Sequence, residues 1–252
     1  MNTNNARVIA ARPLRGLALL AVLVLGLSGC ASPAHRVASD PWEPTNRSVY
    51  RFNDGLDRAI LKPTAKAYVK VTPDWVRTGV GNFFTNLAGP ATALNQLLQG
   101  KFKAAGQDTA RVIINTTLGW GGVFDVATGA SLPQHQEDFG QTLGWWGVPP
   151  GPYLVIPLVG VADLRDAPSK VIDEFLRPLH WWSPTDVRWG SLALSYVDER
   201  ARLLPSDKAL SEAFDPYAFV RESYLQHRRY EVYDGNPPEE PLDLEDPEGA
   251  KP

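Results

Sequence analysis

The feature that most constrains this chain is a stretch of 24 residues without a charge, from Phe139 to Ala162. A helix of that length would be long enough to cross the hydrocarbon core of a bilayer. A spanning helix is excluded, however, because proline removes a backbone donor and clashes with the preceding helical turn. The interrupting residues are Pro149, Pro150, Pro152, Pro157, Gly140, Gly144, Gly147, Gly151 and Gly160.

Two environments are compatible with this stretch. Backbone that is not helical is tolerated at membrane depth only where it is buried in protein or lines a cavity. The stretch is therefore either the interior of a globular fold or part of a channel wall that is embedded in lipid. Taken alone it favours the globular interior, and the rest of the chain reverses that order.

A targeting segment opens the chain. Three arginines, the last of them Arg15, precede an apolar run from Leu17 to Leu27. That run is too short for a transmembrane helix and has the length of a signal-peptide core. We therefore predict that residues 1–29 are a signal peptide.

Cys30 follows this segment directly and is the only cysteine of the chain, so disulfides are excluded. The sequence Leu27-Ser28-Gly29-Cys30 resembles a bacterial lipobox, which implies cleavage before Cys30 and attachment of a diacylglycerol and an N-acyl chain there. Several acyl chains anchor a protein stably where one would not. The residue after the acylated cysteine is Ala31, whereas an aspartate at this position would retain such a lipoprotein in the inner membrane. The resemblance therefore implies export to the periplasmic side of the outer membrane. The alternative is an ordinary secreted protein with a stray cysteine.

The remaining chain divides into three predicted parts: an acylated tether over residues 30–39, a helical domain over residues 40–235, and a disordered tail over residues 236–252. The tail is acidic and rich in proline, a composition that cannot bury a core. Loss of the signal peptide removes three arginines and no acids from a chain that already has a net charge of −3. A nucleic-acid-binding protein would be basic, so that class is not expected.

Helical periodicity runs through the domain. Thr45 is a plausible N-cap of the first helix, and the segment that follows Thr72 reads as helices broken by glycine. Lys62, Lys66 and Lys70 fall on one helix face, which is either a solvated face or a row of side chains that reach toward lipid headgroups. Three asparagines in apolar surroundings are expected to tie helix ends together rather than to bind a ligand: Asn86, Asn95 and Asn115.

Enzyme chemistry is weakly represented. The four histidines are scattered without ligand spacing, so no metal site and no cofactor beyond the acyl chains are expected. Gly119, Gly121 and Gly122 do not form a phosphate loop, because no Lys-Ser/Thr follows them. The best acid/base candidate is the group His135, Glu137 and Asp138, which we expect to be solvated in its loop. The protein is therefore predicted not to be an enzyme.

Many short motifs in order resemble one family, the MlaA (VacJ) outer-membrane lipoproteins. The resemblance spans roughly residues 40–235 and is highly specific. Its pieces are "DPWEPTNR", "RFNDGLD", "NFFTNL", "NQLLQGK", "INTTLGWGGVFDVA", "EDFGQTLGWWG", "GPYLVIPLVG", "LRD" and "DPYAFVRESY".

The resemblance implies an all-α fold: a single ring-shaped domain whose amphipathic helices lie in the membrane plane around a central channel, with a glycine- and proline-rich hairpin. It implies removal of phospholipid misplaced in the outer leaflet and its transfer to a soluble periplasmic carrier, which maintains lipid asymmetry. The implied partners are phospholipid, a trimeric outer-membrane porin and that carrier.

The resemblance also implies site residues. Arg188 matches a basic position of the family's channel, where it would bind a passing phosphate; the alternative is a local cap or ion pair. The gating hairpin corresponds to residues 119–151, with Gly119, Gly121, Gly122, Gly144, Gly147 and Gly151. Pro149 and Pro150 depart from the pattern of some members, which would stiffen one hinge.

Two other functions stay open at this point. The protein could be a structural envelope lipoprotein that binds a porin or peptidoglycan without moving lipid. More weakly, it could be a lipid hydrolase, which would release fatty acid.

Overall fold

The computed structural model describes residues 40–239 of the chain. Cys30, the predicted signal peptide and tether, and residues 240–252 of the predicted tail lie outside this range. The predictions that concern them are therefore not addressed by the structure.

The described chain begins with three consecutive helical segments: α2 (Glu43–Leu56), a π-helical turn η1 (Asp57–Leu61) and α3 (Lys62–Val71). The predicted N-cap at Thr45 is wrong, since α2 already begins at Glu43. Pro44 explains the earlier start, because its fixed φ suits the first helical turn and its missing N–H costs nothing there.

An antiparallel pair follows, formed by α4 (Asp74–Leu98) and α5 (Phe102–Thr117). The predicted glycine breaks are wrong, because α4 continues through its three glycines and through Pro90. Close packing explains these glycines: a Cβ on Gly89 would lie 2.3 Å from Val112 of α5, and one on Gly79 would lie 2.9 Å from Val123. Gly100, with φ +77°, ends the helix in the left-handed conformation that glycine adopts freely.

The uncharged stretch divides between a short helix and a hairpin. After α6 (Val126–Gly129), its first residues form α7 (Phe139–Trp145), and the strands β1 (Tyr153–Ile156) and β2 (Gly160–Asp163) pair antiparallel with Tyr153 opposite Asp163. The all-α prediction is therefore corrected to a mostly helical domain with one small hairpin. The reason is the distribution of the prolines, which all follow α7 and leave its seven residues free to form a helix.

The C-terminal half returns to helices: α8 (Asp166–Leu176), α9 (Pro178–Trp182), α10 (Thr185–Leu203), a 3-10 turn η2 (Leu204–Ser206), α11 (Asp207–Glu212) and α12 (Pro216–Val232). Pro178 separates α8 from α9, because the residue before a proline avoids the helical conformation. Asp215 caps α12, and its carboxylate accepts hydrogen bonds from the backbone N–H groups of Tyr217 and Ala218.

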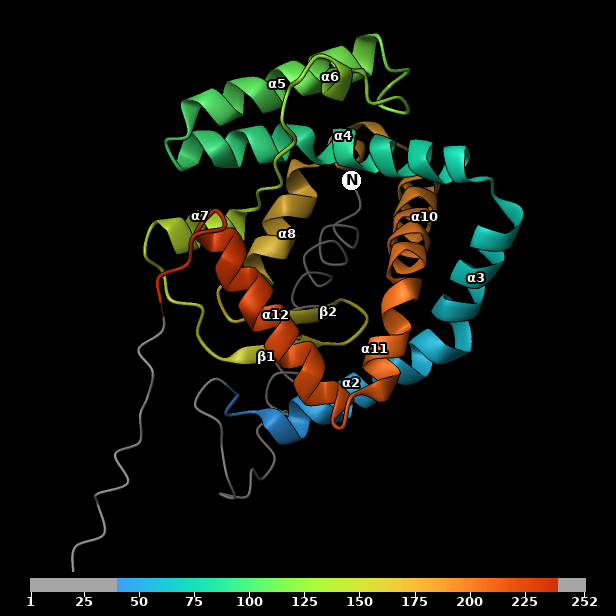
Figure 1. Ribbon diagram of the computed structural model, residues 1–252, viewed down its shortest axis with the longest axis vertical. Coiled ribbons are helices and arrows are strands. Elements are labelled where there is room, and N and C mark those ends of the chain that lie inside the picture. The colour runs from blue at the N-terminus through green and yellow to red at the C-terminus, as the bar shows by residue number, and fades with distance from the viewer. Residues whose placement is uncertain (1–39, 240–252) are drawn as a thin grey trace, which may run out of the picture.

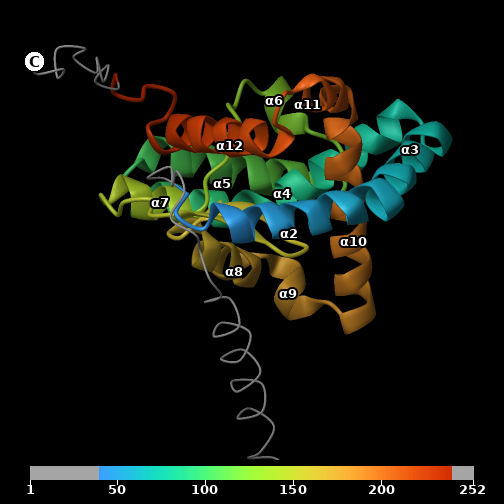
Figure 2. The ribbon, with the colours of Figure 1, turned by 90° about the horizontal axis from the view of Figure 1, so that it is seen from below.

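The molecule is flat. Viewed down the shortest axis, α4 and α5 lie along one edge with α5 outermost, and α3 and α2 continue around the rim (Figure 1). The helix α7 lies on the side opposite α3, α12 runs from α7 toward α2, and α8 and the hairpin lie further inside (Figure 1). The edge-on view shows α2, α4, α5 and α12 running roughly within the plane of this slab, and α9 with one end of α10 projecting from one face (Figure 2).

The interior is more polar than the interior of a soluble domain. The hydrophobic core cluster among the described residues centres on Tyr153, Val155 and Tyr217. Asn46 of α2 fixes the hairpin to this core, since its amide donates to the carbonyl of Tyr153 at 2.9 Å and accepts from the N–H of Val155 at 3.0 Å. Large apolar side chains lie outside instead, among them Trp75, Phe102, Trp120, Trp181 and Trp189. No helix in residues 40–239 is both long and apolar enough to cross a membrane.

Candidate functional site

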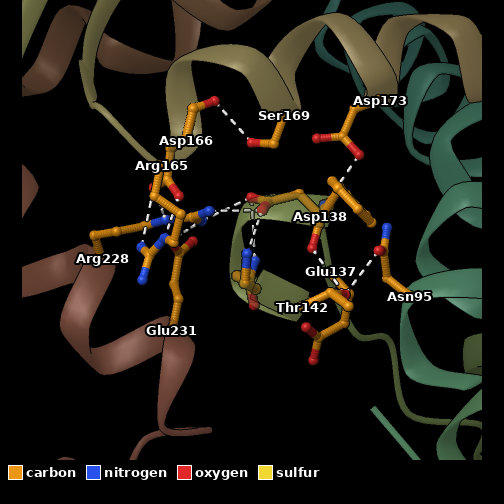
Figure 3. Close-up of polar contacts among 12 residues, drawn as sticks. Asn95, Glu137, Asp138, Thr142, Arg165, Asp166, Ser169, Asp173, Arg228 and Glu231 are labelled. Carbon is orange, nitrogen blue, oxygen red and sulfur yellow. Dashed lines mark hydrogen bonds and ion pairs between the residues drawn. The ribbon is translucent and has the colours of Figure 1, made fainter. Parts of the chain in front are cut away.

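A buried ion cluster joins the three helices α7, α8 and α12 (Figure 3). Its members are Arg228 of α12, Asp138 at the N-terminus of α7, and Asp166 with Arg165 at the start of α8. Arg228 donates to Asp138 through Nη1 at 2.7 Å and Nη2 at 2.6 Å, and its Nε pairs with Asp166. Arg165 donates through Nε to Asp166 at 2.7 Å. The cluster brings together segments 90 residues apart in the chain.

The electrostatics of this cluster follow from its burial. Burial works against the charged form of Arg228, but its bonds to Asp138 and Asp166 prevail and raise its pKa. Burial likewise works to raise the pKa of Asp138, and Arg228 holds it below its usual value. All these groups are therefore charged near neutral pH and mutually compensated, as buried charges must be.

Glycine at position 140 is a requirement of this cluster. A Cβ there would lie 2.3 Å from an Asp166 carboxylate oxygen and 2.5 Å from Nη2 of Arg228. Gly144, one turn later, faces Arg165 in the same way, at 2.7 Å from Nη1. The first turns of α7 therefore approach the ions more closely than any side chain would allow.

Glu137 anchors a second set of contacts, opposite the ion cluster. It accepts hydrogen bonds from Gln99 at 2.8 Å and from Lys101 at 3.3 Å. Thr142 of α7 donates to Asn95 of α4 at 2.8 Å. Burial raises the pKa of Glu137, against the lowering effect of Gln99 and Lys101. These bonds hold α7 against the end of α4.

The segment between α5 and α7 is fixed in a comparable way. Arg111 of α5 makes a two-pronged contact with Asp125, at 2.9 Å to each oxygen. Asn115 donates to Asp125 at 3.0 Å and accepts from the N–H of Ala127 at 2.9 Å. His135 pairs with Asp108 at 3.1 Å. Asn86 donates to Thr116 at 2.9 Å, so the three predicted structural asparagines all bridge elements or helix turns.

These contacts correct one prediction. His135, Glu137 and Asp138 are not a solvated group but separate members of buried or half-buried ion pairs. Each of the three side chains has its own partner, and they do not face a common position where a substrate could react. No group of three or more His, Cys, Asp or Glu side chains in the described part of the chain could hold a metal ion.

The polar side chains surround a cavity of about 420 Å³. Its wall comes from α4, α5, the segment that leads into α7, α10 and the end of α12. It contains amides, hydroxyls and the imidazole of His135 together with acidic and basic side chains, which are Asp108, Arg111, Asp125, Glu137, Asp138, Arg177, Glu199, Arg202 and Glu231. The polar part of this wall is suited to a charged or hydrogen-bonding guest, and Phe84, Ala88 and Val112 add apolar surface beside it.

Arg188 lies next to this cavity and not in it. It borders a much smaller space of about 20 Å³ between α4, α8 and α10. Its Nη1 makes one long contact, at 3.4 Å, to the carbonyl of His180. Phe84, Arg177 and Ser195 border both spaces, so the two are adjacent. This contact is weak, and the other guanidinium donors of Arg188 have no hydrogen-bond partner among the described side chains and backbone of residues 40–239.

The six predicted gating glycines fall into two groups. Gly119, Gly122 and Gly144 are tightly packed: a Cβ on Gly119 would lie 2.1 Å from the carbonyl oxygen of Phe124, and one on Gly122 would lie 2.4 Å from Asn86. The more open positions have positive φ and are Gly121, Gly147 and Gly151, with only Leu164 close to the last. Hinge motion at the first group would disrupt packing, whereas the second group has room.

Sequence reasoning missed one polar face of α10. Ser195, Glu199 and Arg202 recur at four and three residues and therefore share a face, which lines the cavity. The spacing of these three residues is visible in the sequence, but apolar residues such as Trp189, which is 61% exposed, and Ala201, which is 7% exposed, are also spaced along this helix and give no sign of which face lines a cavity. Arg177, at the end of α8, was missed because no motif marks it.

Comparisons with known proteins agree with this description. The family model of the MlaA lipoprotein matches residues 38–231. The chain is 39% identical over 223 residues to the intermembrane phospholipid transport system lipoprotein MlaA of Escherichia coli K12, covering 84% of this chain and 87% of that protein. An uncharacterized protein of Rickettsia felis is 40% identical over 195 residues, covering 77% of this chain and 78% of that protein.

A solved structure provides the fold comparison. It belongs to work on the structural basis for maintenance of bacterial outer membrane lipid asymmetry, and its chain superposes with a TM-score of 0.70 at 36% identity. The match covers 79% of this chain and 100% of that chain. Together with the family match over most of the domain, these findings show that the chain belongs to the MlaA lipoprotein family.

Proposed function

We propose that this outer-membrane lipoprotein moves phospholipid through its own body. As a member of the MlaA family it is an intermembrane phospholipid transport lipoprotein that maintains outer-membrane lipid asymmetry, and it is not an enzyme. The finer proposal is that its helices form a ring in the inner leaflet around a channel. Phospholipid from the outer leaflet passes through that channel to a soluble periplasmic carrier.

One observation carries this proposal: apolar side chains gather on the outside while a cavity with many polar and charged side chains opens between the helices. Trp75, Trp120 and Trp181 are all more than two-thirds exposed, a cost in water that is removed in contact with lipid. The cavity wall would solvate a phosphate headgroup while the acyl tails stay in the surrounding lipid. A protein that only held a porin would need no such cavity.

Individual residues take roles in this proposal. Cys30 is acylated and anchors residues 40–235 through the tether. Arg188, which makes only one weak side-chain contact within the described residues, binds the phosphate by a charge-assisted hydrogen bond. Motion at Gly121, Gly147 and Gly151 gates passage, and a trimeric porin positions the protein in the membrane.

A deletion strain tests the function. Loss of the protein is expected to raise the amount of phospholipid in the outer leaflet and the sensitivity to detergent with EDTA. Wild-type protein restores both, and a Cys30→Ala variant does not. An intact permeability barrier in the clean deletion would contradict the transport function.

A cavity-filling variant separates a conduit from a porin scaffold. Ser195→Trp places an indole at the junction of the two spaces, and Ser211→Trp is its control. Both serines lie on helices and donate to the carbonyl three residues earlier at 2.8 Å, but Ser211 lies on the exposed α11. A conduit loses function only with Ser195→Trp while porin still co-purifies. Full function in that variant would favour the scaffold.

A further inference from the structure

We propose that the cavity selects phospholipids with a zwitterionic, ammonium-bearing headgroup over anionic ones, with Glu199 as the residue that determines this preference and Arg177 as the phosphate anchor. This inference rests on the proposed passage of lipid through the protein. It concerns which lipid headgroup is favoured. That preference is set by the charged side chains of the cavity wall that have no ion-pair partner within the protein.

Most ionised groups of the wall are already paired. Asp108 faces His135, Asp125 faces Arg111, and Glu137 faces Lys101. Asp138 and Glu231 both pair with Arg228. Arg202 pairs with Asp198, one turn earlier on α10. A bound headgroup would have to displace these partners before it could pair with such groups. The paired groups therefore do not discriminate between headgroups of different charge.

Glu199 is different. Its carboxylate makes no ion pair or hydrogen bond within residues 40–239, although it borders the cavity. It lies one turn after Ser195 on the same face of α10. An unpaired carboxylate in the wall attracts a cation and repels an anion, so it is the natural partner of a headgroup ammonium.

Arg177 provides the opposite charge. Its contact with Glu174 is long, at 3.5 Å, and both side chains are 40% exposed, which makes the pair weak. It borders both the cavity and the space beside Arg188. A phosphate handed over from Arg188 therefore reaches Arg177 next. Arg177 and Glu199 together present one positive and one negative group to the same cavity, which is the charge pattern of a phosphate with an ammonium.

The test compares two lipids that share a phosphate and differ in the ammonium. Full-length acylated protein is incubated in detergent micelles with equimolar phosphatidylethanolamine and phosphatidylglycerol, repurified, and its bound lipids are quantified by mass spectrometry. Wild-type protein is expected to retain phosphatidylethanolamine about two- to fivefold over phosphatidylglycerol, the range of one partly exposed ion pair. Phosphatidylcholine, tested in place of phosphatidylethanolamine, shows how much of the preference needs an N–H donor.

Three variants interpret the ratio. Glu199→Gln is expected to bring it to about one, and Glu199→Lys to invert it; Arg177→Gln lowers retention of both lipids in proportion. Glu212→Gln, on the exposed α11, is the control and keeps the wild-type ratio. An equal or reversed ratio in the wild type, or an unchanged ratio in Glu199→Gln, overturns the inference alone. A parallel fall of both lipids in Glu199→Gln assigns that residue a structural role and also overturns it. Absence of any retained lipid in the wild type overturns the conduit itself.

Discussion

The buried ion cluster and the region around Arg188 are both built from arginines and carboxylates, yet they differ in burial and pairing. The side chains of Arg228 and Asp166 are 9% and 3% exposed, and Arg228 donates hydrogen bonds to three carboxylates. Among the described residues, the side chain of Arg177 is 40% exposed with one long contact to Glu174, and the side chain of Arg188 makes one contact, to the backbone carbonyl of His180. Charged side chains that are buried and fully paired stabilise the fold, whereas charged side chains with weak, exposed contacts can bind a ligand.

This difference predicts opposite responses to mutation. Removal of one member of a buried ion cluster leaves the other charged groups without a partner and without water to replace it. The cost in stability is therefore large. Removal of a loosely paired group costs little stability and shows its effect only when lipid is present. The expected change in the free energy of unfolding is therefore largest at Arg228 and smallest at Arg188.

Arg228→Ala should cause the largest loss, about 3–5 kcal/mol, because buried Asp166 would stay buried without its partner and half-buried Asp138 would lose its partner too. Chemical unfolding of the purified protein in detergent, followed by circular dichroism, measures this loss. The control is Arg58→Ala, whose i,i+4 pair with Asp54 leaves Arg58 72% exposed and should cost about 0.5 kcal/mol or less. Equal losses in the two variants would remove the distinction between the regions.

Gly119→Ala should cost about 1–3 kcal/mol, because the new Cβ would overlap the carbonyl oxygens of Phe124 and Asn115, which are backbone atoms that cannot rotate away. Gly129→Ala is the matched control, since a Cβ at Gly129 meets nothing within 4 Å. The thermal midpoints of the two variants measure the difference. A tolerated Gly119→Ala would mean that this turn moves more freely than its packing indicates, and would return Gly119 to the set of hinges.

The sequence predicted a mostly helical domain and the family, because apolar periodicity and short motifs are local signals. It failed where distant residues decide. The glycines after Thr72 read as helix breaks, and only the position of α5 and of Val123 shows that close packing selects Gly79 and Gly89. The hairpin from Tyr153 was missed because an uncharged run with prolines carries no strand period.

The candidate site was less predictable than the fold. Arg188 came from the family resemblance, and no local pattern around it indicates a binding residue. In the sequence Glu199 looks like any other exposed glutamate. That it lines the cavity without an ion-pair partner depends on how the surrounding helices assemble. His135, Glu137 and Asp138 are close in sequence, but their ion-pair partners lie on α5, in the turn between α4 and α5, and on α12, so the three form no common site.

Asp173→Asn should stabilise the protein above about pH 6. Burial raises the pKa of Asp173 to about 6, so the protonated form contributes stability at low pH that is lost as the pH rises through that value. Asparagine keeps an acceptor for the N–H of Phe139, now at 3.0 Å, without the charge. The gain should be on the order of 1 kcal/mol after the partial exposure of the group is allowed for.

Unfolding at about pH 4.5 and about pH 7.5 measures that gain. The variant should differ more from the wild type at the higher pH, and a loss of stability at both values would show that Asp173 is needed as a charge. Asp163 also has its pKa raised to about 6 by burial and by the charge of Asp166, so some pH dependence of the same sign should persist in the variant.

Arg188→Asp should change the free energy of unfolding least, within about 0.5 kcal/mol, because the hydrogen bond that Arg188 donates to the carbonyl of His180 is 3.4 Å long and therefore weak. Its effect on transport should nevertheless be severe, since a carboxylate would repel the phosphate that the arginine binds. The variant protein in the deletion strain should reach the outer membrane at the wild-type level and still leave phospholipid in the outer leaflet. Arg188→Lys, which keeps the charge, should restore part of the activity, and wild-type transport by Arg188→Asp would remove Arg188 from the path of the lipid. If Arg188→Asp instead unfolded the protein, this region would belong with the buried ion cluster after all, and the contrast between compensated and available charge would fail at the residue where it matters most.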